Sequence, residues 1–191
     1  MDSANGVRLA AEEINAAGGI TALNGAKLDV IFADTRGSPL VGAGEAERLI
    51  KEEGVAAIVG TYQSSVTKPA PKVADRLETP FIVSISIADI TGDSTHAYQA
   101  VLVFKDALER SGSCNHKRLQ EALSKTDIPR GPQLVLPADR LCFDENGQNE
   151  FAQLYVVQIQ NGELMPVWPA SCATTNVKGL GKPSHESTSI R

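Results

Sequence analysis

The chain has 191 residues, a net charge of −5 and 42% hydrophobic residues. This length suits one domain with a small appendage, and this composition is sufficient for a buried core. Nucleic acid is not expected as a partner, because its recognition needs a basic surface and the Lys and Arg residues here are scattered singly. No apolar run approaches the roughly 18 to 20 residues of a membrane span. The first residues lack the basic start and apolar core of a signal peptide, so the chain is either a mature form or never exported.

Helix-like and strand-like segments alternate in the first half of the chain. Apolar residues recur at helical spacing in three stretches, within residues 7–14, 41–50 and 66–77. A short apolar run of the kind found in buried strands follows each stretch, at residues 27–33, 55–59 and 80–84. Because the two kinds of segment alternate with short connections, the pattern predicts a parallel sheet flanked by helices. The expected fold class is therefore a three-layer α/β/α arrangement of the flavodoxin-like type.

The second half has a different organisation. Two further helices are predicted around residues 98–108 and 119–123 from their apolar spacing. Residues 154–168 form two strand-like runs around Asn161-Gly162, which predicts a β-hairpin with a type I′ turn. From residue 171 the chain is rich in Ser, Thr, Gly and Lys without apolar periodicity, so residues 171–191 are expected to be a disordered tail.

Polar segments follow the predicted strands at the edge where ligands bind in open parallel sheets, at residues 34–37, 60–65 and 84–87. At Gly60 a strand gives way to hydroxyl-bearing residues and then to a helix, so backbone N–H groups and the helix dipole would face one point. This predicts a site for a carboxylate or another small anion. The alternative is that Ser64 only caps its helix. The candidate solute-binding residues are Tyr62, Gln63, Ser64, Ser65, Ser84 and Ser86.

No catalytic, cofactor or metal site is expected. The chain has no G-x-S-x-G elbow, phosphate-binding loop, H-E-x-x-H or G-x-G-x-x-G motif. Asp34 follows a strand, but no histidine lies in a plausible partner segment, so we expect it to bind backbone N–H groups of its own loop. The three histidines and three cysteines have no metal-ligand spacing. The cysteines are interpreted as incidental thiols, with an intermolecular disulfide as the alternative.

Several motifs resemble one known family, the type I periplasmic binding proteins, and most closely the Leu/Ile/Val-binding receptors of ABC transporters. The motifs of the first half are LAAEEINAAGGI (9–20), ADTRGSP (33–39), AERLI (46–50), IVGTYQSS (58–65) and PFIVS (80–84). Those of the second half are DALERSGS (106–113), LQEAL (119–123), FDENGQN (143–149) and VQIQNG (157–162). The similarity extends over residues 5–170.

The resemblance implies a solute-binding protein of an amino-acid uptake system, not an enzyme. It would work in the periplasm with an ABC permease as partner and an amino acid or similar carboxylate as ligand. Ser64 matches the family's loop serine, and Ser86 lies in the matching strand-end segment. Ile87 stands where the family pattern has threonine, so one side-chain hydrogen bond to the ligand would be missing.

The resemblance also implies a truncation. The family's first strand and its whole second lobe have no counterpart, so residues 1–91 and 92–170 would form a single lobe. An open half-site buries little of a small ligand, which predicts weak affinity. A missing interior strand leaves free sheet edges, so we expect the C-terminal hairpin or a strand from a second copy, by domain swapping, to fill the gap. The alternative function is a remnant or interaction protein that dimerises through the open sheet and binds no solute.

Overall fold

The computed structural model describes residues 3–61, 63–84, 93–136, 138–152, 156–168, 170 and 173–178. It divides into two units, residues 1–152 and 153–191, where the sequence predicted one lobe extending to residue 170. The helices of the first unit are α1 (Ser3–Ala16), the 3-10 helix η1 (Thr21–Leu23), α2 (Pro39–Lys51), α3 (Ser64–Thr67), α4 (Pro69–Arg76), α5 (Asp93–Ser111) and α6 (His116–Ser124). Its strands are β1 (Ile58–Gly60), β2 (Phe81–Val83), β3 (Asp127–Pro129) and β4 (Arg140–Cys142).

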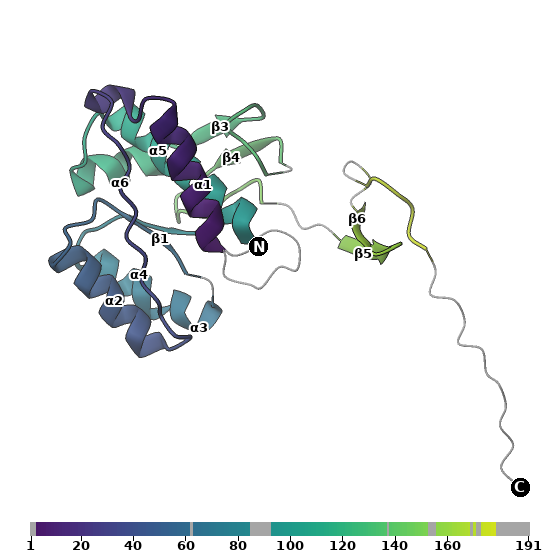
Figure 1. Cartoon of the computed structure of the whole chain (residues 1–191), viewed down its shortest axis with the longest axis horizontal. Coiled ribbons are helices and arrows are strands. Elements are labelled where there is room, and N and C mark those ends of the chain that lie inside the picture. The colour runs from purple at the N-terminus through teal and green to yellow at the C-terminus, as the bar shows by residue number, and fades with distance from the viewer. Residues whose placement is uncertain are drawn as a thin grey trace, which may run out of the picture. The chain divides into compact units, whose positions relative to one another are not determined.

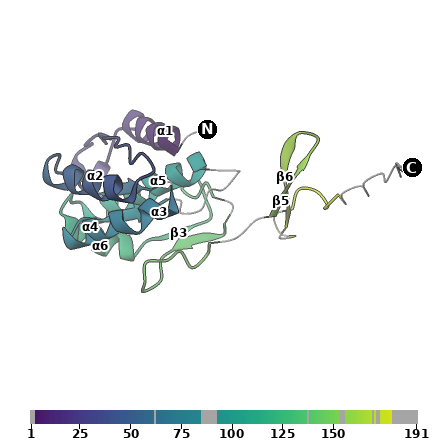
Figure 2. The same cartoon turned by 90° about the horizontal axis from the view of Figure 1, so that it is seen from below.

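A short parallel sheet lies between two groups of helices. β1 and β2 run in parallel, with Ile58 opposite Phe81 and Gly60 opposite Val83. Figure 1 shows β1 between a group formed by α1, α5 and α6 and a group formed by α2, α3 and α4. Figure 2 shows the same helices from below, and the two groups overlap in that view. Within them α1 packs on α5, and α2 packs on α4. This is the α/β fold class that the sequence predicted, in an incomplete form.

The main core forms where α1, α5 and α6 meet. Helical spacing places Ala10 and Ile14 of α1 on the face that α5 covers. The other buried members are Ile20, Val101, Val103, Ala107, Leu108, Leu119, Ala122, Leu123, Ile128, Leu134 and Leu141. Each fully buried large aliphatic side chain, such as Leu119, contributes about 2 kcal/mol. The predicted apolar faces of these helices are therefore confirmed.

The end of α1 requires glycine. Gly18 and Gly19 have φ angles of +112° and +84°, which side chains with a Cβ rarely adopt. A Cβ at Gly19 would also lie 2.4 Å from the carbonyl oxygen of Ala26. This close approach lets the chain turn back beside the helix.

The first helix of the second helical layer has a side-chain cap. Ser38 precedes α2 in an extended conformation, and its hydroxyl accepts a hydrogen bond from the backbone N–H of Val41 at 3.4 Å. The predicted third helix is interrupted at Lys68, which separates α3 from α4. Pro69 begins α4, as expected from the missing N–H and fixed φ of proline.

The predicted strand at residues 27–33 is wrong. Within the described residues this segment has no ladder partner. It is attached at its start, where Asn15 exchanges two hydrogen bonds with the backbone of Leu28, at 2.7 and 2.8 Å. Ile31 and Phe32 are 41% and 44% exposed. An apolar run becomes a strand only where a neighbouring strand offers hydrogen bonds, and none of the described strands pairs with this one.

His116 of α6 contacts the residues that precede both strands of the parallel sheet. One ring nitrogen of His116 lies 3.1 Å from the carbonyl oxygen of Val55, which precedes β1. The other lies 3.3 Å from the hydroxyl of Thr79, which precedes β2. The ring therefore holds α6 against the amino ends of β1 and β2.

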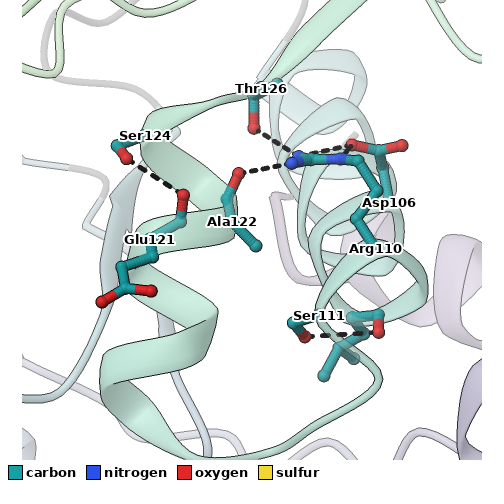
Figure 3. A network of polar contacts seen from close by, with 8 residues as sticks. Asp106, Arg110, Ser111, Glu121, Ala122, Ser124 and Thr126 are labelled. Atoms are coloured by element: carbon teal, nitrogen blue, oxygen red, sulfur yellow. Dashed lines mark hydrogen bonds and ion pairs between the residues drawn. The ribbon is translucent and has the colours of Figure 1, made fainter.

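A hydrogen-bond network around Arg110 of α5 holds the carboxyl end of α6 (Figure 3). The guanidinium of Arg110 donates to the Asp106 carboxylate at 2.8 Å and to the Ala122 carbonyl at 2.7 Å. It also donates to the Thr126 hydroxyl at 3.1 Å. Arg110 thus adds a second hydrogen bond to the Ala122 carbonyl, which also accepts from the backbone N–H of Lys125 at 3.2 Å.

The second unit is the predicted hairpin, formed by β5 (Val156–Gln160) and β6 (Glu163–Trp168) in antiparallel pairing. Asn161 and Gly162 have φ angles of +57° and +84°, as the type I′ turn requires. Residues 173–178, which we expected in a disordered tail, are hydrogen-bonded to β5 of this hairpin. The Gln158 side chain exchanges two hydrogen bonds with the backbone of Lys178, at 2.7 and 2.9 Å.

Glu109 makes the attachment of η1 to α5 sensitive to acid. Its carboxylate accepts hydrogen bonds from the backbone N–H groups of Ala22 at 2.8 Å and Thr21 at 2.9 Å. These bonds hold the pKa of Glu109 below its ordinary value. Its contribution to stability is therefore complete above the pKa of an unfolded glutamate and is lost as pH falls through the lowered pKa.

We predict that Glu109→Gln lowers the free energy of unfolding at neutral pH and makes it fall less steeply with acidification. Urea unfolding at several pH values measures both effects. The control is Glu12→Gln, whose side chain makes no hydrogen bond or ion pair to the described residues. An equal change in acid sensitivity in both variants would contradict this role for Glu109.

Candidate functional site

The carboxyl end of β1 leads directly into α3. Gly60 ends the strand, and α3 begins at Ser64. Gln63 occupies the N-cap position of α3, so the alternative that Ser64 caps this helix is wrong. The Gln63 carbonyl accepts from the backbone N–H groups of Val66 at 2.9 Å and Thr67 at 3.0 Å. Ser64 therefore stands at the first helical position, one residue later than a capping serine.

Two of the three predicted ligand-edge segments lie against each other. Gly37, in the segment 34–37, has a φ of +66°. A Cβ at this position would lie 2.6 Å from the side-chain oxygen of Gln63. The Gln63 carboxamide therefore rests on the backbone of Gly37, and a larger residue there would displace it.

A second contact joins the same two segments. Gly42 is buried in α2, and a Cβ there would lie 2.3 Å from Cγ1 of Val66 and 3.4 Å from Cγ2 of Thr35. Glycine thus lets α3 approach α2 closely. Val66 is fully buried. This contact fixes the start of α3 beside the segment 34–37.

Two hydroxyl groups fix the turn between β1 and α3. The hydroxyl of Thr67 donates to the Gln63 carbonyl at 3.0 Å. The hydroxyls of Thr61 and Thr67 are 2.5 Å apart, and because Thr67 already donates elsewhere, Thr61 donates to it. Sequence reasoning missed both threonines, since neither lies at a recognisable capping spacing.

The third predicted segment begins where β2 ends. Val83 pairs with Gly60, so Ser84 follows the same edge of the sheet and is partly buried there. Gln63 and Ser65 are exposed, and of Ser64 only the backbone is described. Tyr62 and Ser86 lie outside the described residues.

The chemistry at this edge is that of neutral hydrogen-bond donors. Among the described residues, no group accepts a hydrogen bond from the backbone N–H of Ser64 or Ser65. α3 is a single turn of four residues, so its dipole adds little to these donors. Asp34 accepts from the backbone N–H of Arg36 at 2.8 Å, which confirms its predicted role in its own loop.

The described residues lack metal-binding and membrane-spanning features. They contain no group of three or more His, Cys, Asp or Glu side chains placed to hold a metal ion. None of their helices has both the length and the apolar character needed to cross a bilayer.

A polar hollow of about 330 Å³ lies elsewhere, between α5 and α6. Arg110, Ser111, Arg118, Glu121, Ala122 and Lys125 line it. None of these residues belongs to the three ligand-edge segments, and the Arg110 guanidinium is already bonded to Asp106, Ala122 and Thr126. We therefore interpret this hollow as a surface depression at the contact between α5 and α6, and we place the candidate site at the sheet edge.

Comparison with protein families identifies the chain. The family model described as "Periplasmic binding protein" matches residues 1–98, about half of the chain, including both contacting segments and β2. The chain belongs to the periplasmic binding protein family.

Individual relatives of this periplasmic binding protein cover parts of the same region. An "Amino acid binding protein" of Pseudomonas aeruginosa is 43% identical over 70 residues, which are 37% of this chain and 18% of the relative. The "Leu/Ile/Val-binding protein homolog 7" of Brucella suis is 31% identical over 126 residues, 65% of this chain and 31% of the relative. The "Leu/Ile/Val-binding protein homolog 8" of Brucella abortus is 39% identical over 92 residues, 48% of this chain and 22% of the relative. The chain thus spans a third or less of the length of these relatives.

Two solved structures have similar folds. The branched-chain amino acid transporter substrate-binding protein LivJ from Streptococcus pneumoniae, in complex with isoleucine, is 22% identical. The match covers 63% of this chain and 39% of LivJ, with a TM-score of 0.42. A substrate-binding protein from Desulfitobacterium hafniense, in complex with Leu, is 20% identical over 64% of this chain and 41% of its own, with a TM-score of 0.41.

The glycine at position 42 provides a test of how this periplasmic binding protein assembles its site. We predict that Gly42→Ala lowers the free energy of unfolding by about 1–3 kcal/mol, because the new methyl group overlaps the buried Val66 side chain. Adding Val66→Ala to that variant removes the overlapping atom and should recover part of the loss. Urea unfolding of both single variants and the double variant measures this coupling.

Gly44→Ala is the matched control on the same helix. A Cβ at Gly44 would meet nothing within 4 Å, so alanine should leave stability unchanged or raise it by up to about 1 kcal/mol. Strictly additive effects of Gly42→Ala and Val66→Ala would show that α2 and α3 do not pack as described.

Proposed function

We propose that this chain binds a small carboxylate-bearing solute, an amino acid of the Leu/Ile/Val class, at the carboxyl edge of its parallel sheet. The observation that carries the proposal is the convergence of the segment 34–37, the β1–α3 turn and the end of β2 at one edge. Relatives named as amino acid and Leu/Ile/Val-binding proteins support the choice of solute.

The solute carboxylate would accept hydrogen bonds from the backbone N–H groups of Ser64 and Ser65. Hydrogen bonds to a charged acceptor are about twice as strong as neutral ones, so a few donors suffice to orient the group. The hydroxyls of Ser64, Ser65, Ser84 and Ser86 would add donors, and Tyr62 and Gln63 would form the walls. The proposed function is non-covalent binding, which requires no cofactor or metal.

This site encloses the solute from one side, which limits its affinity. Ligand pockets usually bury most of the surface of a small ligand, and Gln63 and Ser65 are exposed. We therefore propose weak binding by this chain alone. By family, its place would be the periplasm and its partner the permease of an ABC-type amino-acid uptake system.

Thermal unfolding with leucine, isoleucine and valine tests the proposal. A solute at 100 times its dissociation constant should stabilise the fold by about 2.7 kcal/mol, which raises the melting temperature. Ser64→Ala should weaken the effect. Ser124→Ala is the control, because its hydroxyl only donates to the Glu121 carbonyl on α6.

Two outcomes would contradict this function. The first is an unchanged melting temperature with all three amino acids at millimolar concentration. The second is an equal response in Ser64→Ala, Ser124→Ala and the unchanged chain, which would remove the Ser64 hydroxyl from the proposed site.

A second candidate function is self-association through the open sheet without solute binding, including exchange of a strand between two copies. The observation that favours it is the one-sided pairing of β1, whose only ladder partner among the described strands is β2. Exposed sheet edges readily pair with other chains.

A further inference from the structure

We infer that the free edge of β1 pairs with residues 29–33 of a second copy of this chain, in a reciprocal contact. The inference rests on the second candidate function and names the two surfaces that meet.

The unpaired edge of β1 follows from the atoms that its ladder uses. The backbone N–H of Ile58 donates to the Pro80 carbonyl at 3.0 Å, so Ile58 and Gly60 direct their backbone groups toward β2. Backbone groups alternate sides along a strand, so Ala57, Val59 and Thr61 direct theirs to the opposite edge. No described residue bonds to the backbone N–H groups on that side. Unpaired backbone groups beside partly buried apolar residues are costly, which favours a partner strand.

Residues 29–33 have the properties of that partner. They carry the sequence DVIFA, and no backbone hydrogen bond joins them to any described residue. An apolar run such as Val30 to Ala33 suits a strand covered by helices on both faces, and β1 itself lies between the two helix groups. Ile31 and Phe32 are 41% and 44% exposed, so large apolar side chains already face solvent.

The segment is held in place for an approaching partner. At one end Leu28 is bonded to Asn15 of α1, and at the other the Asp34 carboxylate bonds the backbone N–H of Arg36. The guanidinium carbon of Arg8 lies 4.6 Å from the Phe32 ring centre. A second copy can therefore meet the segment without unfolding it, which lowers the entropic cost of pairing.

The two surfaces make the contact self-complementary. Each chain carries the outer edge of β1 and the strand-like segment 29–33, and neither has a backbone partner among the described residues. A two-fold axis lets each copy donate its segment to the other copy's β1, which satisfies both surfaces in both chains. Such a contact closes on itself and gives a dimer rather than a fibre.

Sedimentation of the full chain at about 10 and about 300 μM measures the association. We expect a monomer–dimer equilibrium. Val59→Pro should raise the dimer dissociation constant about tenfold or more, because it removes an outward-facing N–H and leaves the β1–β2 ladder intact. Circular dichroism should show that this variant remains folded. Ile58→Pro is the control, since it removes the N–H that bonds Pro80 and should unfold the sheet.

Phe32→Asp tests the other surface and should raise the dissociation constant similarly. Its control is Leu40→Asp, at an apolar position that is 83% exposed on α2. Hydrogen exchange gives an independent measurement, since protection of the Val59 amide should increase with protein concentration. If Val59→Pro cannot be folded, this measurement on the unchanged chain and Phe32→Asp still decides the question.

The possible failures are distinguishable. A monomer at all concentrations would overturn both the inference and the self-association function. A dimer that survives Phe32→Asp, with Val59 exchange independent of concentration, would overturn the inference and leave self-association through another surface. Solute binding is measured separately by the melting temperature, so neither result bears on it.

Discussion

The parallel ladder between β1 and β2 is the contact on which the rest of the first unit depends. It involves three residues in each strand, yet it lies between the α1–α5–α6 layer and the α2–α3–α4 layer. His116 reinforces its amino end by contacting Val55 and Thr79. At its carboxyl end the ladder brings Gly60 level with Val83, which places the β1–α3 turn beside Ser84. The candidate solute site therefore depends on a small sheet whose two outer edges have no ladder partner among the described strands.

Helices were predictable from the sequence because their apolar spacing and end signals are local. Ala10 and Ile14 are buried as their spacing requires, and Gly18-Gly19 and Asn161-Gly162 adopt the positive φ angles that their turns need. The strand predicted at residues 27–33 failed for the opposite reason. A strand requires a partner that can be distant in sequence, and apolar character alone does not supply one.

The candidate site was predictable at the level of segments and not of contacts. The rule that ligands bind at the carboxyl ends of parallel strands located the three segments, and the structure places 34–37 against the β1–α3 turn. The contacts that hold them depend on Gly37, Gly42 and the Thr61–Thr67 hydroxyl pair. These depend on tertiary approach, which spacing does not encode. The resemblance to periplasmic binding proteins was confirmed by the family match over residues 1–98, whereas the roles of the individual serines stay predictions.

The most direct test of this account is whether the two ligand-edge segments lie together in solution. Nuclear Overhauser spectroscopy can detect contacts between the α-protons of Gly37 and the side-chain amide protons of Gln63. The account predicts such contacts, together with contacts between the methyl groups of Thr35 and Val66. Well-resolved signals of both glycine and glutamine without any contact between them would contradict it, because the sheet would then not assemble a solute site at this edge.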